Sequence, residues 1–220
     1  MSSRLKSVKG SALTSRGIAT RAKILESSEH VFAKYGYHEA SIVKITEHAG
    51  IGLGTFYLYF DSKKTIFEAL VDDLNRRVRH SMSEAMEGAK TRLEAERAGF
   101  EGFFKFTSKH PALYRVVREA EFVSPEAMQM HYTKIVKGYQ EGLTRASEQG
   151  EIDETLDPET AAWALMGIGE LIGMRFILWE GSLTGGQATE ITNERFDHMM
   201  KFINNALAPR TTADKEGPHD

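Results

Sequence analysis

Apolar residues recur along most of the chain at intervals of three and four, the spacing of one face of an α-helix. The first clear run covers residues 19–35, where Ile24, Val31 and Phe32 share a face and Gly36 follows as a C-cap. Alternation with a period of two, the mark of a half-buried strand, is nearly absent. The sequence therefore predicts an all-α fold.

Two short helical patterns follow the first helix. Ser41 is a suitable N-cap for a helix that ends at Gly50, and residues 53–59 form a second, shorter helix after a glycine-marked turn. A helix this short is not stable alone, so we expect Phe56 and Phe60, four residues apart, to anchor it in a core. The arrangement predicts a helix-turn-helix, whose second helix enters the major groove of DNA.

Anchoring residues 53–59 through the two phenylalanines leaves an unusual set of side chains outside. The set combines hydroxyls, rings and bare backbone: Leu53, Gly54, Thr55, Tyr57, Leu58 and Tyr59. Hydroxyls and backbone N–H groups bind phosphates, and tyrosine rings meet thymine methyls and sugars. Asp61 and Ser62 then offer a cap for the next helix, and Lys63 in its first turn opposes the helix dipole. That misfit is explained if Lys63 faces a phosphate; a solvated surface lysine is the alternative.

The rest of the chain continues as helices. Leu70, Val71, Leu74, Val78 and Met82 form one apolar stripe, four phenylalanines crowd residues 100–106, and Leu113, Val116, Val117, Ala120 and Phe122 are expected to face inward after Pro111. Ser124 and Pro125 open the next helix, which stops at Gly150. Asp157 and Pro158 open another, and a last helix covers residues 193–208.

The helix that begins at Pro158 is apolar on all sides. Only Glu170 and Arg175 interrupt the run from Ala161 to Trp179, and these two charges argue against a membrane span. Burial against a second subunit explains such a helix better, so we expect a four-helix bundle between two copies. The residues predicted for this contact are Gly169, Gly173, Phe176, Phe196, Met200 and Ile203.

Composition narrows the class of protein. Apolar residues make up 41% and charged residues 27%, which is typical of a globular chain, and the absence of cysteine excludes disulfide scaffolds and thiolate sites. Residues 1–64 carry a net charge of +5 and residues 65–220 a net charge of −8. A basic head on an acidic body suits attraction of phosphate by one end. We expect a flexible basic arm at 1–17, a helix-turn-helix domain at 18–64, a ligand-binding and dimerisation domain at 65–208 and a disordered tail at 209–220.

Motifs of catalysis are missing. The eight histidines lack metal-ligand spacing, and the glycine-rich pieces neither follow a strand pattern nor precede a suitably placed lysine. There is no G-x-S-x-G elbow. We therefore expect no metal, no cofactor and no enzymatic activity. The basic, polar N-terminus has no apolar core of a secretory signal, which favours the cytoplasm.

The stretch AGIGLGTFYLYFDSKKTIFEAL resembles the DNA-binding signature of the TetR family of bacterial transcription regulators, and the resemblance covers about residues 18–70. It implies a homodimeric repressor that leaves its operator when a small molecule enters the helical body. It also implies DNA contacts from Ser41, Leu53, Gly54, Thr55, Tyr57, Tyr59 and Lys63. Two departures stand out: Gly52 lies where serine or threonine is common, and Leu53 where a polar residue is common.

A regulator of this kind needs an effector site, and buried charges beside aromatic side chains are the candidates. The residues proposed for it are Phe104, Tyr114, Arg118, Glu121, Tyr132, Tyr139, Trp163 and Glu170. Arg115 and Arg118 favour an anionic, partly apolar effector such as an acyl-CoA. A cationic drug bound by Glu121 and Glu170 is the alternative, as is a helical ligand-binding protein that does not act on DNA. For each residue alone, a core position or an internal ion pair is the simpler reading.

Overall fold

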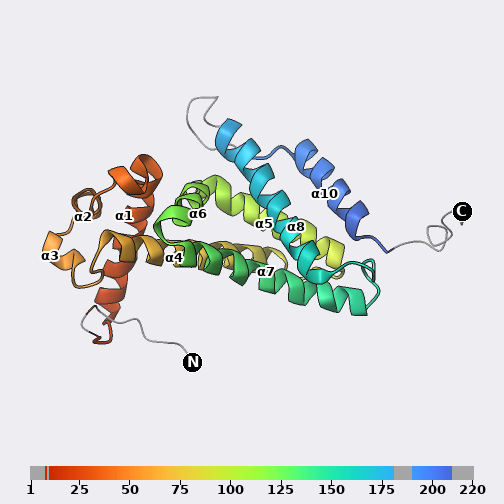
Figure 1. The fold of residues 1–220 in the computed structure, drawn as a ribbon, viewed down its shortest axis with the longest axis horizontal. Helices are drawn as coiled ribbons and strands as arrows, with labels where there is room; N and C mark the ends of the chain where they lie inside the picture. Colours follow the sequence, from red (N-terminus) through yellow and green to blue (C-terminus); the bar gives the residue numbers. More distant parts are fainter. Residues whose placement is uncertain (1–7, 9, 181–189, 210–220) are drawn as a thin grey trace, which may run out of the picture. The chain divides into compact units, whose positions relative to one another are not determined.

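The computed structural model describes residues 8, 10–180 and 190–209. These residues form helices joined by short turns, with an isolated β-bridge at Ala12 and no β-strand, and the predicted all-α fold is confirmed (Figure 1). The contacts divide the chain into two compact units. Unit 1 consists of Met1–Arg76 and Pro111–His131, and unit 2 of Arg77–His110 and Tyr132–Asp220.

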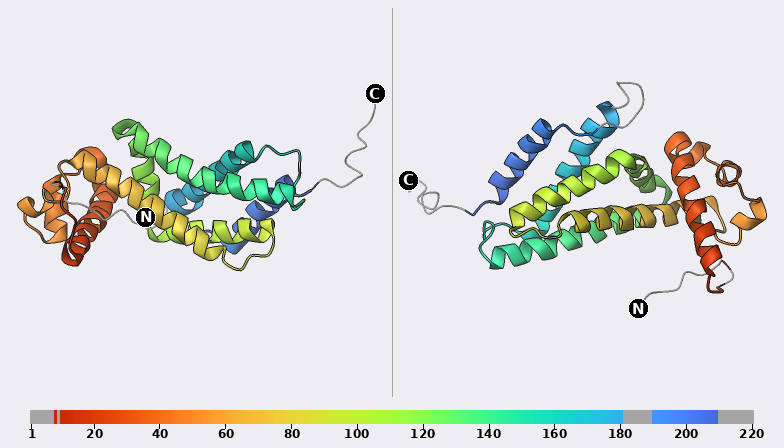
Figure 2. Two further views of the ribbon diagram at one scale, coloured as in Figure 1. Left: turned by 90° about the horizontal axis from the view of Figure 1, so that it is seen from below. Right: turned by 180° about the vertical axis from the view of Figure 1, so that it is seen from behind.

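Unit 1 contains the predicted helix-turn-helix. Its helices are α1 (Ser15–Glu39), α2 (Ile42–Ala49), α3 (Leu53–Phe56), the first part of α4 (Lys63–Ala85), α6 (Ala112–Val123) and the start of α7 (Pro125–Glu148). Helix α2 packs against α1, α3 packs against α2, and α6 also packs against α1 (Figure 2). The sequence predicts that the DNA-binding domain ends at residue 64. The contacts within the structure instead group α6 with the helix-turn-helix in one unit.

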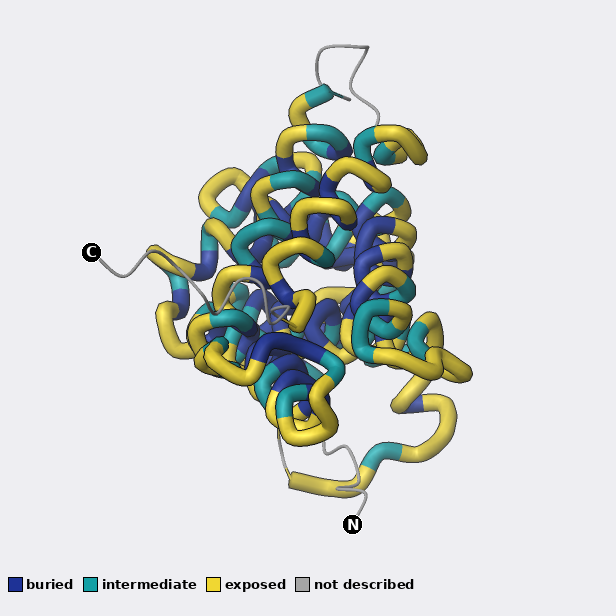
Figure 3. Tube along the Cα trace, turned by 90° about the vertical axis from the view of Figure 1, so that its right-hand side faces the viewer, coloured by how far each residue is buried: buried dark blue, intermediate teal, exposed yellow. Residues whose placement is uncertain are grey.

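Unit 2 is a helical body. It contains the rest of α4 and α7, with α5 (Arg92–Lys109), α8 (Pro158–Gly173), a π-helix (Met174–Trp179) and α10 (Asn193–Leu207). The phenylalanines of α5 are all buried, so this helix forms much of the core. In Figure 3 the buried positions follow the inner faces of the helices and the exposed positions the outer faces.

Side-chain caps set where several helices begin. The hydroxyl of Thr14 accepts a hydrogen bond from Gly17 N at 3.2 Å, which starts α1 at Ser15 rather than at the predicted residue 19 or 20. Asp157 caps α8 by accepting a hydrogen bond from Thr160 N at 2.7 Å. Hydrogen bonds from the side chain and the backbone of Thr160 lower the pKa of the Asp157 carboxyl. Asp157 and Pro158 therefore open the helix as predicted.

The structure departs from the sequence-based expectations at the end of α3 and at Phe122. Helix α3 ends at Phe56, and residues 57–59 form a turn rather than the predicted end of the helix. Phe122 was expected to face inward, which is wrong, because 82% of it is exposed at the end of α6. Among the described residues, Pro158–Trp179 is long and apolar enough to cross a membrane by length and composition alone, properties it shares with core helices.

The end of α1 is the most constrained backbone in unit 1. At Gly36 the chain leaves helical geometry with φ 71° and ψ 174°, a region that is nearly restricted to glycine. Glu119 of α6 accepts a hydrogen bond from Tyr37 N at 2.8 Å, and Arg115 donates to Ala33 O at 2.8 Å. Two side chains of α6 thus satisfy backbone groups that the break at Gly36 leaves without helical partners.

Replacing Gly36 by alanine should lower the free energy of unfolding by about 2–4 kcal/mol, because backbone strain adds to the displacement of Arg115 and Glu119 from their hydrogen bonds to α1. A Cβ at this position would lie 2.6 Å from Arg115 Nη2 and Glu119 Oε1. Gly88 also has a positive φ, of 86°, but a Cβ there meets nothing within 4 Å. Gly88→Ala is therefore the matched control in urea denaturation, and equal losses for both variants would contradict the clash.

Candidate DNA interface and ligand cavities

The helix-turn-helix is built around local caps and two buried rings. Ser41 accepts from Lys44 N at 3.2 Å to start α2, and Gly50 ends α2 in the left-handed conformation, with φ 62°. Helix α3 has Gly52 at its N-cap and no side-chain cap. Phe56 and Phe60 are fully buried, with ring centroids 5.7 Å apart, so packing rather than capping holds α3 in place.

Burial of Phe56 and Phe60 leaves the residues predicted to contact DNA at least partly exposed. Leu53 and Tyr57 are 47% and 46% exposed, and Gly54 is also exposed. Thr55 and Tyr59 are half-buried. A surface with two large exposed side chains and an open backbone is suited to a partner. Contact of these residues with DNA stays a prediction, as does contact from Ser41.

Lys63 lies differently from the simple expectation of a lysine that points to solvent. Its ammonium donates to Tyr37 O at 2.7 Å, Ala40 O at 2.9 Å and His38 O at 3.2 Å, and it lies 4.4 Å from the centroid of the Tyr37 ring. These are carbonyls at the end of α1, where a cation also complements the helix dipole. Lys63 thus caps α1 in this structure, and its contact with a phosphate stays a prediction.

The predicted effector residues are divided between the two units. Tyr114, Arg118 and Glu121 lie on α6 in unit 1, where Tyr114 is buried and the other two are exposed. Arg115, which suggested an anionic effector, instead pairs with Glu119 and binds α1. Unit 2 holds the remaining candidates: Phe104, Tyr132, Tyr139, Trp163 and Glu170.

Within unit 2 the structure brings together three of the predicted effector residues. The Tyr132 hydroxyl lies 2.8 Å and 2.9 Å from the two carboxylate oxygens of Glu170 and donates to that group. The Trp163 ring centroid lies 6.3 Å from that of Tyr132, and 46% of Trp163 is exposed. The Glu170 carboxylate, a charge within the apolar run of α8, is therefore stabilised by a hydrogen bond from α7.

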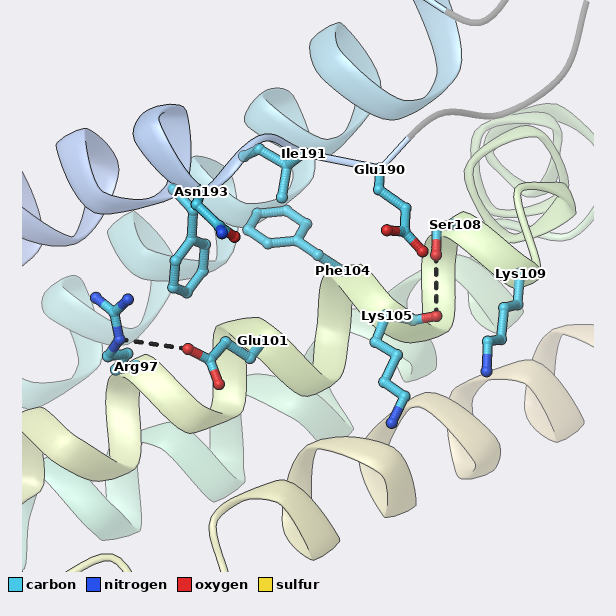
Figure 4. Close-up of a pocket in the computed structure, with 10 residues that line it drawn as sticks. Arg97, Glu101, Phe104, Lys105, Ser108, Lys109, Glu190, Ile191 and Asn193 are labelled. Carbon is cyan, nitrogen blue, oxygen red and sulfur yellow. Dashed lines mark hydrogen bonds and ion pairs between the residues drawn. The ribbon is translucent and has the colours of Figure 1, made fainter.

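A groove of about 420 Å³ runs between α5 and the segment 190–196 (Figure 4). In Figure 4, Phe104 of α5 lies beside Ile191, while Arg97 pairs with Glu101 at 3.3 Å. In Figure 4 the Lys105 and Lys109 side chains extend away from the Phe104 side of the groove. The groove therefore combines an apolar part with charged side chains of both signs.

The residues predicted for dimerisation fall into two groups. Gly173, Phe196, Met200 and Ile203 are buried inside unit 2, and a Cβ on Gly169, which is also buried, would lie 3.0 Å from Phe100 Cε1 of α5. The open side of Gly169 is thus filled by Phe100 of its own unit, and contact of these residues with a second copy stays a prediction.

An exposed apolar face lies between α8 and α10. Phe176 lines a hollow of about 690 Å³ between α8 and α10, together with Leu171 and Phe202, which are 60% and 63% exposed. The helical period identifies the apolar stripes of these helices but does not say which stripe the chain itself covers. Leu171 and Phe202 were missed for this reason.

Comparison with known proteins gives a consistent result. The model of the bacterial regulatory proteins of the tetR family matches residues 24–70. The uncharacterized HTH-type transcriptional regulator YdgC of Bacillus subtilis (strain 168) is 30% identical over 186 residues, which cover 82% of this chain and 93% of that protein. The fatty acid metabolism regulator protein of the same organism is 28% identical over 156 residues, covering 66% and 77%.

Solved structures show the same fold at lower identity. The transcriptional regulator FadR from Bacillus subtilis, solved in complex with stearoyl-CoA, superposes with a TM-score of 0.70 at 20% identity and covers 83% of this chain and 96% of its own. FadR from Bacillus halodurans gives a TM-score of 0.72 at 20% identity, covering 84% and 94%. The helix-turn-helix and the full-length similarity agree, and the chain belongs to the TetR family of DNA-binding transcriptional regulators.

Proposed function

We propose that this regulator is a homodimeric, cytoplasmic repressor that binds operator DNA through α3 and is released by an acyl-CoA. The observation that carries the DNA-binding part is the division of α3 and the turn after it into two buried rings, Phe56 and Phe60, and an exposed surface of Leu53, Gly54 and Tyr57. Ser41, Thr55, Tyr59 and Lys63 complete the proposed contact set. No catalytic activity is proposed.

Dimerisation is supported by the face between α8 and α10. Leu171, Phe176 and Phe202 present large apolar surfaces there, which cost free energy in water and are stabilised by a second copy of the chain. Two reading helices on a two-fold dimer would meet successive major grooves about 34–36 Å apart. A monomer at micromolar concentration in analytical ultracentrifugation would contradict the dimer.

The effector class is supported by two lines of argument. The relatives include a fatty acid metabolism regulator and a FadR solved with stearoyl-CoA, although the identities are 28% and 20%. Unit 2 also has a groove whose apolar part, formed by Phe104, Ile191 and Phe196, suits an alkyl chain. A cation would instead be expected to compete for Glu170, whose oxygens now accept from Tyr132.

Replacing Tyr57 by alanine should weaken binding to a DNA fragment selected by the wild-type protein about tenfold or more, because an exposed ring that meets the groove is lost. The free energy of unfolding should change by less than about 0.5 kcal/mol, since Tyr57 is largely exposed. Phe122→Ala removes an even more exposed ring from the same unit and should leave DNA affinity unchanged. Wild-type affinity in Tyr57→Ala, measured by mobility shift, would refute the assignment of α3.

Lys63→Ala should have two separate effects. The free energy of unfolding should fall by about 1–2 kcal/mol, because three carbonyls at the end of α1 lose their donor. If the ammonium also meets a phosphate, the slope of log affinity against log salt concentration should fall by about one. Lys64→Ala is the control, since Lys64 is exposed and lies 3.7 Å from Glu68. A normal slope with reduced stability would assign Lys63 to capping alone.

Stearoyl-CoA should release the protein from labelled DNA in a fluorescence anisotropy titration, whereas free coenzyme A should not, because the alkyl chain supplies most of the apolar burial. A lipophilic quaternary ammonium compound is the matched test of the alternative effector. Release by that compound, lost in Glu170→Gln, would replace the acyl-CoA proposal while leaving the DNA-binding proposal intact.

A further inference from the structure

The positive charge of the first 64 residues is concentrated before the helix-turn-helix. Residues 1–16 contain no acidic residue and four cations: Arg4, Lys6, Lys9 and Arg16. Residues 17–64 contain six cations and five acidic residues, which leaves a net charge of +1. The helix-turn-helix itself is therefore almost neutral, and most of the charge that could attract DNA precedes it.

The proposed reading surface has no charge of its own. None of residues 53–60, which form α3 and the turn after it, is acidic or basic. Attraction between a protein and DNA that does not depend on base sequence comes from lysine and arginine side chains opposite phosphates. A surface made of leucine, glycine, threonine and tyrosine therefore needs cations from another part of the chain.

Three of the six cations within residues 17–64 make contacts inside the protein. Lys63 donates to three carbonyls at the end of α1, and Lys44 donates to Glu39 O at 2.7 Å. The guanidinium of Arg21 lies 5.0 Å from the centroid of the Phe60 ring. These contacts stabilise the domain, so the cations that precede α1 are the better candidates for phosphate contacts.

A main-chain hydrogen bond ties the residues before α1 to the uncharged surface. Val8 N donates to Leu58 O at 3.1 Å, and both residues belong to unit 1. Both side chains are exposed, so the bond lies at the surface of the unit. Leu58 stands between Tyr57 and Tyr59, two of the residues proposed to contact DNA. The chain that leads to α1 therefore passes beside the proposed contact set.

Covalent geometry limits how far the preceding cations are from this bond. Lys6 is two residues and Arg4 is four residues before Val8. An extended chain spans at most about 3.6 Å per residue, so the Cα atoms of these cations stay within about 7 Å and 14 Å of that of Val8. Phosphates follow one another about every 3.4 Å along each strand of a duplex. A duplex that meets Tyr57 would thus have phosphates within reach of both cations.

We propose that residues 1–8 form a second DNA contact, in which Arg4 and Lys6 bind phosphates beside the part of the duplex that meets α3. The hydrogen bond from Val8 to Leu58 holds this segment in place. The proposal rests on the DNA-binding function proposed above and adds the source of its electrostatic attraction. Phosphate contacts carry no base information, so residues 1–8 add affinity for any DNA, and discrimination is left to the surface of α3.

The double variant Arg4→Gln/Lys6→Gln of the full chain tests the proposal. Fluorescence anisotropy over a series of salt concentrations would compare a DNA fragment selected by the wild-type protein with an unrelated duplex of the same length. The slope of log affinity against log salt concentration should fall by about 1.8 per bound copy of the chain, because each lost phosphate contact contributes about 0.9. Affinity for both duplexes should fall by the same factor, about tenfold or more at low salt.

The double variant Arg210→Gln/Lys215→Gln is the matched control, because it removes one arginine and one lysine from the other end of the sequence. It should leave the slope and both affinities unchanged. An unchanged slope in Arg4→Gln/Lys6→Gln, or equal losses in the two double variants, would overturn the proposal and leave the assignment of α3 intact. No binding of either duplex by the wild-type protein would refute the proposed function, and this contact with it.

Two substitutions at Val8 test the hydrogen bond to Leu58. Proline lacks the N–H that donates to Leu58 O, whereas alanine keeps it. Val8→Pro should weaken binding to both duplexes about threefold, and Val8→Ala should leave it unchanged. Val8 precedes α1, so neither variant should alter the unfolding midpoint in urea. Equal affinities of the two variants would contradict the placement of this segment by Leu58.

Discussion

The orientation of the reading helix depends on how the end of α1 is held. At Gly36 the backbone leaves the helix, and side chains from two other helices then complete the hydrogen bonds that the helix no longer makes: Arg115 and Glu119 from α6, and Lys63 from α4. Because α2 begins only a few residues later, these bonds fix the direction in which the helix-turn-helix leaves α1. Helix α3 has one turn and no side-chain cap, so its position is determined by its packing against α2 and by the burial of Phe56 and Phe60.

This dependence joins α6 to the DNA-binding unit rather than to the helical body. The Glu119 carboxylate is bound by a backbone amide of the segment that leads to α2, so a displacement of α6 would have to break a charge-assisted hydrogen bond or move that segment with it. Coupling between a ligand and a distant site requires an element with two arrangements that both sites bias. Through Glu119 and Arg115, the position of α6 is tied to the backbone at the end of α1.

The accuracy of the sequence-based predictions depends on the range of the interaction involved. Ser41, Gly50 and Asp157 identify helix ends correctly, because a cap is a contact between residues three or four apart. The start of α1 was missed because Thr14 lies within a polar segment that shows no apolar period. Phe122 was placed inward by its position near the end of an apolar stripe, yet it lies one residue before the last residue of α6 and is exposed.

The same distinction applies to the candidate sites. The exposed surface of α3 could be predicted because burying Phe56 and Phe60 determines which side chains remain outside a short helix. The cavities could not be predicted, since each joins residues from helices far apart in sequence; Arg92 and Lys134, for example, are brought together only by the packing of α5 against α7. Arg92 also looks ordinary in the sequence, as an arginine four residues before a glutamate usually forms a weak surface pair. In the fold the Arg92–Glu96 pair is instead buried, and Arg92 Nε has no hydrogen-bond partner among the described residues.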